Sequence, residues 1–392
     1  MTGTQRRSGA DRPEGREGPP SAGSIAERRL ASNRLVGPAL GAPVEVVRWF
    51  GAMQAQEYGP ATWAIGLRTR GVTGLDVDRL FDAGAILRTH VLRPTWHFVV
   101  PEDLRWLLAL TGPRVHVANG PLYRQMDLDA GILHRAHATI RSALEGGATH
   151  TRQELAAALR TAGVEAEGPR LAYIVMHAEL EALICSGPRR GRQFTYALLD
   201  ERVPPAPPRD RDDALAEIAR RYVTSRGPAQ AVDLAWWSGL TVTDSRRALE
   251  LAGDDLEVFE LGRRRFWAAR AADALDPVAF ERPLVRLLPI YDEYFIGFRD
   301  RSDFGDAARL GRDDDALGAN IVVLDGSIVG GWRRTTGKGQ VAIAVELLVR
   351  FDAAERRALE TAAAEFGRFV GLPVALTVTE RPAAAIRRSA LP

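Results

Sequence analysis

The stretch that decides the fold of this chain spans residues 53–64 and reads MQAQEYGPATWA. In it two glutamines, Gln54 and Gln56, alternate around one small apolar residue, where an apolar helical pattern gives way to a Gly-Pro turn. Because a helix does not run through Pro60, both glutamines are expected at a helix end. If the backbone is extended there, side chains two residues apart share a face, and both amides point at one small volume.

Two interpretations of this glutamine pair are open. Each amide carries donors and an acceptor, so the pair could hold a water molecule or a sugar oxygen, although an amide is too weakly basic to take a proton. Alternatively, both side chains cap the end of the helix and have no role in chemistry. The spacing of the two residues does not decide between these interpretations.

Composition excludes several classes of function. The chain has 392 residues, 46% of them hydrophobic, and a formal net charge of +2, which fits roughly two to three globular domains. Lys338 is the only lysine among the 52 basic residues, so amine nucleophiles are scarce. Cys185 is the only cysteine, which excludes disulfides, thiolate zinc sites and iron–sulfur clusters. No apolar run approaches the ~18 residues that span a membrane, so we expect a cytoplasmic protein.

Helices followed by a β-ribbon recur three times along the chain, an order typical of winged helices. A Thr-x-x-Glu capping box at Thr151 marks one helix start, and acidic residues after Pro101 mark another. The expected elements are helices over 26–35, 43–53 and 75–83 with strands in 86–100, helices over 151–163 and 169–183 with a hairpin over 184–198, and helices over 214–224, 229–237 and 243–253 with a ribbon over 256–268.

The C-terminal part differs, because strand patterns at 284–290, 321–324, 327–332 and 341–349 precede a single long helix at 352–369. Asp325-Gly326 is a tight-turn signal between two strands, and residues 306–315 are expected to form a loop. The fold class is therefore α+β, mainly α, with three tandem winged-helix motifs and a small C-terminal α+β lobe that contains a β-hairpin. The expected segments are a disordered tail (1–22), winged helix 1 with the glutamine stretch (23–120), winged helix 2 (121–205), which a Pro-rich linker closes, winged helix 3 (206–283) and the lobe (284–392).

Both later ribbon tips carry clusters of arginine, at 189–192 and at 263–265. In a winged helix, the helix before the ribbon enters a groove of nucleic acid and the ribbon tip contacts the backbone. Solvated surface arginines would explain either cluster alone. Repetition at the same place in two units favours contact with phosphates.

Metal chemistry is not expected from the sequence. His134 and His137 are three apart on a helix, but no cysteine, histidine or acidic partner follows at ligand spacing. His97 alternates with Thr95 and Arg93 on one strand face. It is either a functional residue or a core histidine whose hydrogen bonds are made by neighbouring residues.

An acidic run at 291–303 admits two interpretations as well. Its carboxylates, among them Asp292, could act as acid or base groups. Ion-paired loop structure explains the same residues equally well.

Taken together, these residues resemble the AlkZ-like winged-helix DNA glycosylases. The resemblance covers about residues 25–385, and it rests on the order of the motifs along the chain, since no single motif is specific. The motifs are Gln54-Ala55-Gln56 leading into Thr62-Trp63-Ala64, the strand Arg93-Pro94-Thr95-Trp96-His97-Phe98, the three tandem units, and Leu287-Leu288-Pro289-Ile290-Tyr291-Asp292-Glu293-Tyr294 with Gly297 and Arg301.

The resemblance implies hydrolysis of the N-glycosidic bond of N7-alkylated purines in DNA, in some members including interstrand crosslinks, as part of base excision repair or self-resistance to a genotoxin. The family's catalytic pattern is glutamine, one apolar residue, then glutamine or aspartate, and Gln54 and Gln56 match the glutamine branch. An N7-alkylated purine is already cationic, so it leaves without protonation. Two amides then need only position a water molecule and stabilise an oxocarbenium-like sugar.

On this basis the expected partner is double-stranded DNA that carries alkylated purines, bound by a monomer with no cofactor, no metal and no membrane contact. A non-catalytic winged-helix DNA-binding or regulatory protein is the alternative, and a degenerate family member that senses damage is a third reading. The residues expected to contact substrate or DNA are Arg93, Thr95, His97, Arg190, Arg192, Arg264, Arg265, Tyr291, Asp292, Arg301, Trp332, Arg333 and Lys338.

Overall fold

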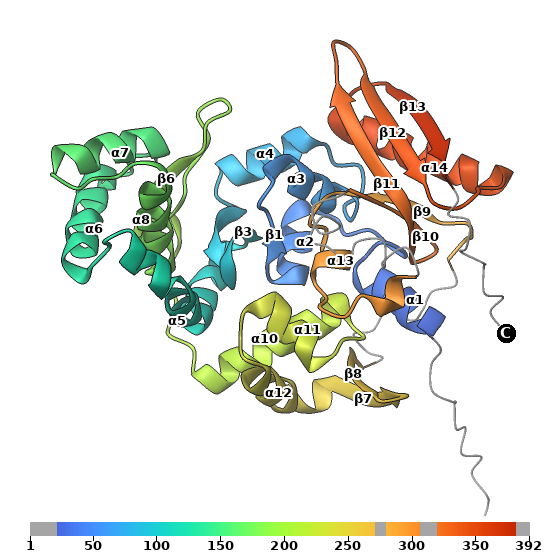
Figure 1. Cartoon of the computed structure of the whole chain (residues 1–392), viewed down its shortest axis with the longest axis horizontal. Coiled ribbons are helices and arrows are strands. Elements are labelled where there is room, and N and C mark those ends of the chain that lie inside the picture. Colours follow the sequence, from blue (N-terminus) through green and yellow to red (C-terminus); the bar gives the residue numbers. More distant parts are fainter. Residues whose placement is uncertain (1–21, 271–279, 306–319, 382–392) are drawn as a thin grey trace, which may run out of the picture.

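A computed structural model describes residues 22–270, 280–305 and 320–381 of the chain (Figure 1). The fold is a mixed α+β structure with 49% helix and 20% strand, which confirms the expected class. The expected tail lies outside the described residues except for Ala22, and so does the loop expected over 306–315. Within the described part, no helix is both long and apolar enough to cross a membrane.

The first unit holds the glutamine stretch on a short strand between two helices. Its small antiparallel sheet has the order β1-β3-β2. The helix expected to continue to residue 53 ends earlier, and Pro60 lies in the first turn of a new helix, where its missing N–H is not needed. The elements are α1 (Ala22–Ser32), α2 (Pro43–Phe50), β1 (Met53–Gln54), α3 (Tyr58–Gly66), α4 (Gly74–Asp82), β2 (Leu87–Val91) and β3 (Arg93–Val99).

The second unit has an apolar core of its own, between α6, α7 and α8. The capping box is present as expected, because the Glu154 carboxylate accepts the Thr151 N–H at 2.7 Å. The helix expected at His134 and His137 is α6, whose bounds the sequence did not predict. Helix α5 runs without a break across residue 120, the expected boundary between the first two units. The elements are α5 (Pro101–Gln125), α6 (Ala130–Leu144), β4 (His150–Thr151), α7 (Arg152–Thr161), α8 (Gly168–Leu180), β5 (Ile184–Ser186), β6 (Thr195–Leu198) and α9 (Leu199–Arg202).

The third unit packs through α10 against α2 and α5, so it shares a core with the start of the chain. Helices precede a small antiparallel sheet here too, in the order that the sequence predicted, and their assignment as three winged helices remains a prediction. The elements are α10 (Arg211–Arg226), α11 (Ala231–Ser238), α12 (Val242–Leu251), the 3₁₀ turn η1 (Gly253–Asp255), β7 (Leu256–Leu261) and β8 (Arg264–Ala269).

The C-terminal lobe is a five-stranded sheet of order β13-β12-β11-β10-β9, with α14 against one face. The indole of Trp63 in α3 meets the Phe366 ring of α14 edge-on at 5.1 Å and donates to the Leu287 carbonyl at 2.9 Å, which fixes the lobe to the first unit. The sequence did not predict β13. The elements are β9 (Val285–Leu288), α13 (Glu293–Ile296), the 3₁₀ turn η2 (Ser302–Phe304), β10 (Ile321–Leu324), β11 (Ser327–Thr336), β12 (Val341–Leu347), α14 (Ala353–Val370) and β13 (Val374–Glu380).

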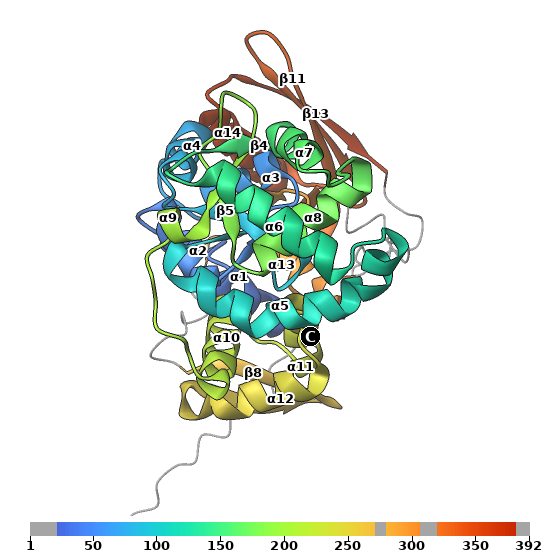
Figure 2. The same cartoon turned by 90° about the vertical axis from the view of Figure 1, so that its left-hand side faces the viewer.

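Two loops project from the same side of the molecule. The β11–β12 hairpin, whose turn contains Lys338, and the loop between β5 and β6 both rise at the top of Figures 1 and 2. The third unit, with the β7–β8 ribbon, lies at the bottom of both views. The two arginine-rich tips therefore face different sides of the protein.

Candidate active site

The glutamine stretch is extended as far as Gln54, the last residue of β1, and the chain bends at Gln56. Gln54 lies opposite His97 in the antiparallel pair of β1 and β3, and the Ala55 N–H donates to the Trp96 carbonyl at 2.7 Å. Because the Gln54 N–H bonds elsewhere, Gln54 and His97 form a non-hydrogen-bonded pair, the kind in which facing side chains lie closest. The two side chains therefore occupy one face of the sheet.

Neither glutamine caps a helix. The Gln54 amide oxygen accepts from Arg93 Nη2 at 2.9 Å, and the Gln56 amide oxygen faces the Trp96 N–H at 3.4 Å. Helix α2 has already ended at Phe50, and the residue that precedes α3 makes no side-chain capping bond. The capping interpretation is therefore excluded.

The side-chain amide of Gln54 is fixed more firmly than that of Gln56. A guanidinium only donates, so the oxygen of Gln54 must face Arg93, and the Gln54 NH₂ group is left for another partner. Gln54 is buried, whereas Gln56 is half-buried and its 3.4 Å contact is longer than an ordinary N–H···O bond. The peptide between them is fixed by Arg88, which donates to the Ala55 carbonyl at 2.8 Å.

Buried polar atoms without partners in the described part of the chain occur on β3, which pairs with Gln54, and on Arg301. Arg93 Nε, Thr95 Oγ1 and His97 Nε2 are buried and have no hydrogen-bond partner among the residues that the structure describes, and Arg301 Nη2 shares this property. The guanidinium carbons of Arg93 and Arg301 each lie 5.5 Å from the centre of the Trp236 ring, so this indole joins the two arginines. Since buried polar atoms nearly always have partners, these four atoms mark a place for water or a ligand.

His97 is a neutral hydrogen-bond acceptor at this place. Its Nδ1 lies 2.9 Å from the Thr95 carbonyl, which can only accept, so Nδ1 carries the proton and Nε2 carries the lone pair. The ring is fully buried. This burial, followed by the charge of Arg93, holds the pKa of His97 well below its ordinary value.

A buried ion pair fixes the backbone that carries Gln54. Glu293 Oε1 accepts the Gln54 N–H at 2.6 Å, and its Oε2 accepts from Arg226 Nε at 2.9 Å and Nη2 at 2.7 Å. Arg226 also donates to the carbonyls of Phe50 at 3.1 Å and Ala52 at 2.8 Å. The sequence placed Glu293 only within an acidic run and gave no signal for Arg226, because 67 residues separate the two.

Two of the predicted contact residues, Asp292 and Trp332, are buried and bonded to the protein itself. Both oxygens of Asp292 accept from the buried Arg68, at 2.7 and 2.8 Å, and Asp292 also caps α13. Trp332 is buried, and its indole N–H donates to the Leu288 carbonyl at 2.8 Å. Tyr291 is half-buried in a left-handed backbone conformation with φ of 62°. Ion-paired structure is therefore the correct interpretation of Asp292 and Glu293 in the acidic run.

Two of the arginines predicted to contact DNA form ion pairs within the protein, and two form none with the described residues. Arg190 pairs with Glu154, and the Arg264 guanidinium bonds both oxygens of Asp303 at 2.8 and 3.0 Å. Arg192 and Arg265 are exposed and form no ion pair with any residue in the described ranges. These two are the better candidates for phosphate contacts.

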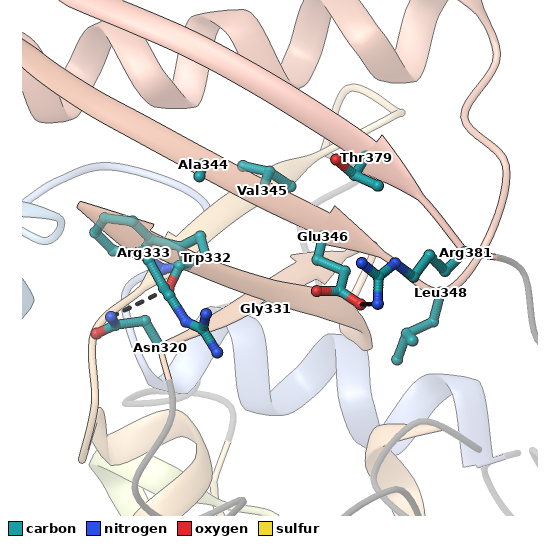
Figure 3. A pocket seen from close by; sticks show the side chains of 10 residues that line it. All are labelled: Asn320, Gly331, Trp332, Arg333, Ala344, Val345, Glu346, Leu348, Thr379 and Arg381. Atoms are coloured by element: carbon teal, nitrogen blue, oxygen red, sulfur yellow. Dashed lines mark hydrogen bonds and ion pairs between the residues drawn. The ribbon is translucent and has the colours of Figure 1, made fainter. Parts of the chain in front are cut away.

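A separate hollow of about 580 Å³ lies on the sheet of the C-terminal lobe (Figure 3). The exposed Arg333 and Thr379 line it beside an ion pair of Glu346 with Arg381 at 3.4 Å, and Asn320 donates to the Trp332 carbonyl at 3.2 Å. No residue of the glutamine site lines this hollow. The candidate active site therefore remains the face of β1 and β3.

Comparison with known proteins gives the family and supports the fold. A family model described as DNA glycosylase AlkZ-like matches residues 47–369. The chain belongs to this family of DNA glycosylases. The glycosylase is also similar to a solved structure, the DNA glycosylase AlkZ of Streptomyces sahachiroi, with a TM-score of 0.75 and 20% identity over 91% of this chain and 100% of that chain. No curated protein matches the sequence.

The buried pair makes a prediction about stability. Glu293→Gln leaves Arg226 without a counter-charge, and we expect the free energy of unfolding to fall by about 3–5 kcal/mol in urea titrations. Arg48→Ala is the control, because it removes an exposed pair with Glu102 and should change the same quantity by less than about 1 kcal/mol.

A variant that replaces both Arg226 and Glu293 tests the stability of the fold separately from the positioning of Gln54. The double variant Arg226→Met and Glu293→Leu should regain most of the lost stability, because no buried charge stays unpaired. Its excision rate should stay low, since the Gln54 N–H has lost its acceptor. Excision at the wild-type rate by this double variant would show that the pair does not position Gln54.

Proposed function

We propose that this glycosylase hydrolyses the N-glycosidic bond of N7-alkylated, cationic purines in DNA. The observation that carries the proposal is that the groups at the site, two amides, one neutral imidazole and arginine guanidiniums, include no free carboxylic acid among the described residues. The nearest carboxylate, that of Glu293, is already bound by Arg226 and by the Gln54 N–H. Such a site has no acid for a neutral leaving base, whereas a cationic purine needs none.

In the proposed reaction, water attacks C1′ of the sugar as the bond from C1′ to the purine nitrogen breaks. The bonding electrons go to the purine and neutralise its positive charge. Gln54, Gln56 and the His97 lone pair hold the water, and its proton passes through His97 Nε2 to solvent. A weakly basic acceptor suffices, because water adds to a sugar that already has oxocarbenium character.

The buried arginines take a separate role in this proposal. Arg93 Nε and Arg301 Nη2 are donors without partners, and phosphates beside the lesion would supply acceptors. Those phosphates also offset the repulsion between the guanidinium groups and the cationic sugar. Arg192, Arg333 and Lys338 are proposed to contact phosphates farther along the duplex, whereas Arg265 lies on the ribbon tip that faces another side of the protein (Figures 1 and 2) and is not placed on the same stretch.

The proposal extends to a purine whose N7 group joins it to the second strand. Such a purine carries the same positive charge and leaves by the same route, so one side of an interstrand crosslink would be released. The repair or self-resistance role follows from this substrate class.

Substitution of the glutamines tests catalysis directly. Gln56→Ala should slow release of 7-methylguanine from duplex DNA by roughly 10² to 10⁴, which corresponds to about 3 to 5 kcal/mol of barrier, with DNA affinity almost unchanged. Gln153→Ala, on the second unit, is the matched control and should excise at the wild-type rate. If Gln54→Ala and Gln56→Ala both excise normally, a DNA-binding role without catalysis by this pair is the better account.

The pH dependence of excision tests the role of His97. Because the pKa of His97 is lowered, its Nε2 lone pair persists as pH falls through about 6.5, where an ordinary histidine becomes protonated. Single-turnover rates should therefore vary by less than about twofold between about pH 5.5 and 8. A decline of about tenfold per pH unit below about 6.5 would show that His97 titrates normally and would contradict this role.

The salt dependence of DNA binding tests the exposed arginines. Arg192→Gln should lower the slope of log affinity against log salt by about 0.9, equally for all sequences. Arg190→Gln should change this slope less, because Glu154 already neutralises the Arg190 guanidinium. Equal slopes for wild type and Arg192→Gln would assign Arg192 to the solvated surface.

Trapping experiments test whether the enzyme is monofunctional. A lyase step needs an amine that forms a Schiff base with the opened sugar. Lys338, the only lysine, lies in the exposed turn of the β11–β12 hairpin and not among the residues around Gln54. Borohydride should therefore trap no covalent adduct, and strand breaks should appear only after alkali. An adduct that Lys338→Ala abolishes would place the chemistry at the hairpin.

A further inference from the structure

The second unit gathers histidines that the glutamine site does not use. His116 of α5, His137 of α6 and His177 of α8 come together, although they are far apart in the sequence. Ligand atoms of His116, His177 and Glu181, the residue that follows α8, all lie within 4.8 Å of one another. We propose that His116, His177 and Glu181 bind a divalent transition-metal ion, with zinc as the best match.

The distances suit a tetrahedral ion. His116 Nε2 lies 3.1 Å from Glu181 Oε1. Zinc holds nitrogen and oxygen ligands at about 2.0–2.2 Å, so neighbouring ligands in a tetrahedron lie roughly 3.3–3.5 Å apart. Two imidazoles and a carboxylate are one of the ligand sets that zinc uses, with water in the fourth position. Nitrogen donors make the site a poor one for magnesium or calcium.

Hydrogen bonds orient the two imidazoles for this purpose. The Tyr123 hydroxyl lies 2.9 Å from His116 Nδ1, which leaves Nε2 of that ring for an ion. His116 Nε2 is buried and lies against the Glu181 carboxylate, at 3.1 Å from Oε1. His137 Nε2 lies 3.2 Å from His177 Nδ1, so the second nitrogen of His177 is free as well. Partners of this kind on the far nitrogen are usual for metal-binding histidines.

Burial of the three histidines also suits metal binding. Burial, followed by the neighbouring His116 and His137, lowers the pKa of His177 to about 3. Burial lowers the pKa of His116 and of His137 in the same direction. Metal ions bind the neutral form of imidazole, which burial favours.

The site would tie α5 to α8 at the surface of the second unit. Glu181 is half-exposed, which gives an ion access from solvent. The sequence offered only His134 and His137 as a possible pair of metal ligands, and no third ligand follows them at a suitable spacing. His177 and Glu181 are four residues apart at the end of α8, but His116 comes from α5, so spacing along the chain could not reveal the complete set.

Zinc titration of the full-length protein, after treatment with EDTA, tests this inference. Calorimetry should show one equivalent of Zn²⁺ bound with a Kd of about 1 μM or below, and no binding of Mg²⁺ under the same conditions. His116→Ala and Glu181→Gln should each weaken zinc binding by more than about 100-fold, and Tyr123→Phe by about 10- to 100-fold. Glu181→Gln changes a half-exposed side chain, so its fold should survive even if His116→Ala unfolds the unit.

His134→Ala is the matched control, because His134 is exposed on the same face of the unit and is not a proposed ligand. It should leave the zinc affinity unchanged. The inference is overturned if the wild type binds no zinc, if Glu181→Gln binds it as tightly as the wild type, or if His134→Ala loses as much affinity as His116→Ala.

Discussion

The buried contact of Glu293 with Arg226 is the constraint on which the rest of the site depends. Burying two charges carries a desolvation cost that only good geometry and full hydrogen bonding offset. Both conditions are met, because the carboxylate also accepts the Gln54 N–H and the guanidinium also donates to the carbonyls of Phe50 and Ala52. The pair thereby joins α10, α13 and the segment before β1, and it sets where Gln54 can point.

In this arrangement the carboxylates near the site are bound to arginines and have no role in the proposed reaction. The acidic residues near the site are held by arginines, Asp292 by Arg68 and Glu293 by Arg226. The groups left without partners are an imidazole, a hydroxyl and guanidinium donors. A site of this kind offers no free carboxylic acid to a leaving base, and this is the basis on which we propose a positively charged one. Damage selectivity would then come from the charge of the lesion.

Local patterns in the sequence predicted local structure well. The capping box at Thr151 and the strand over 321–324 have the expected positions, because they depend on neighbouring residues alone. Helix α3 was missed since Pro60 was taken as a helix breaker, although a proline in a first helical turn costs nothing. The family motif located Gln54 and Gln56, and their catalytic role remains a prediction. Residues that are distant in sequence from the glutamines, such as Arg226 and Trp236, have no local sequence pattern that marks them as part of the site. The burial of Asp292 and Trp332 had no such pattern either.

The most direct test is a crystal structure of the enzyme with duplex DNA that carries a cationic aza-sugar in place of the damaged nucleoside. The account predicts that an ordered water and the aza-sugar nitrogen both lie within about 3.2 Å of side-chain atoms of Gln54, Gln56 or His97. A sugar bound elsewhere, for instance in the hollow beside Arg333, with Gln54 and Gln56 contacting only protein, would contradict it.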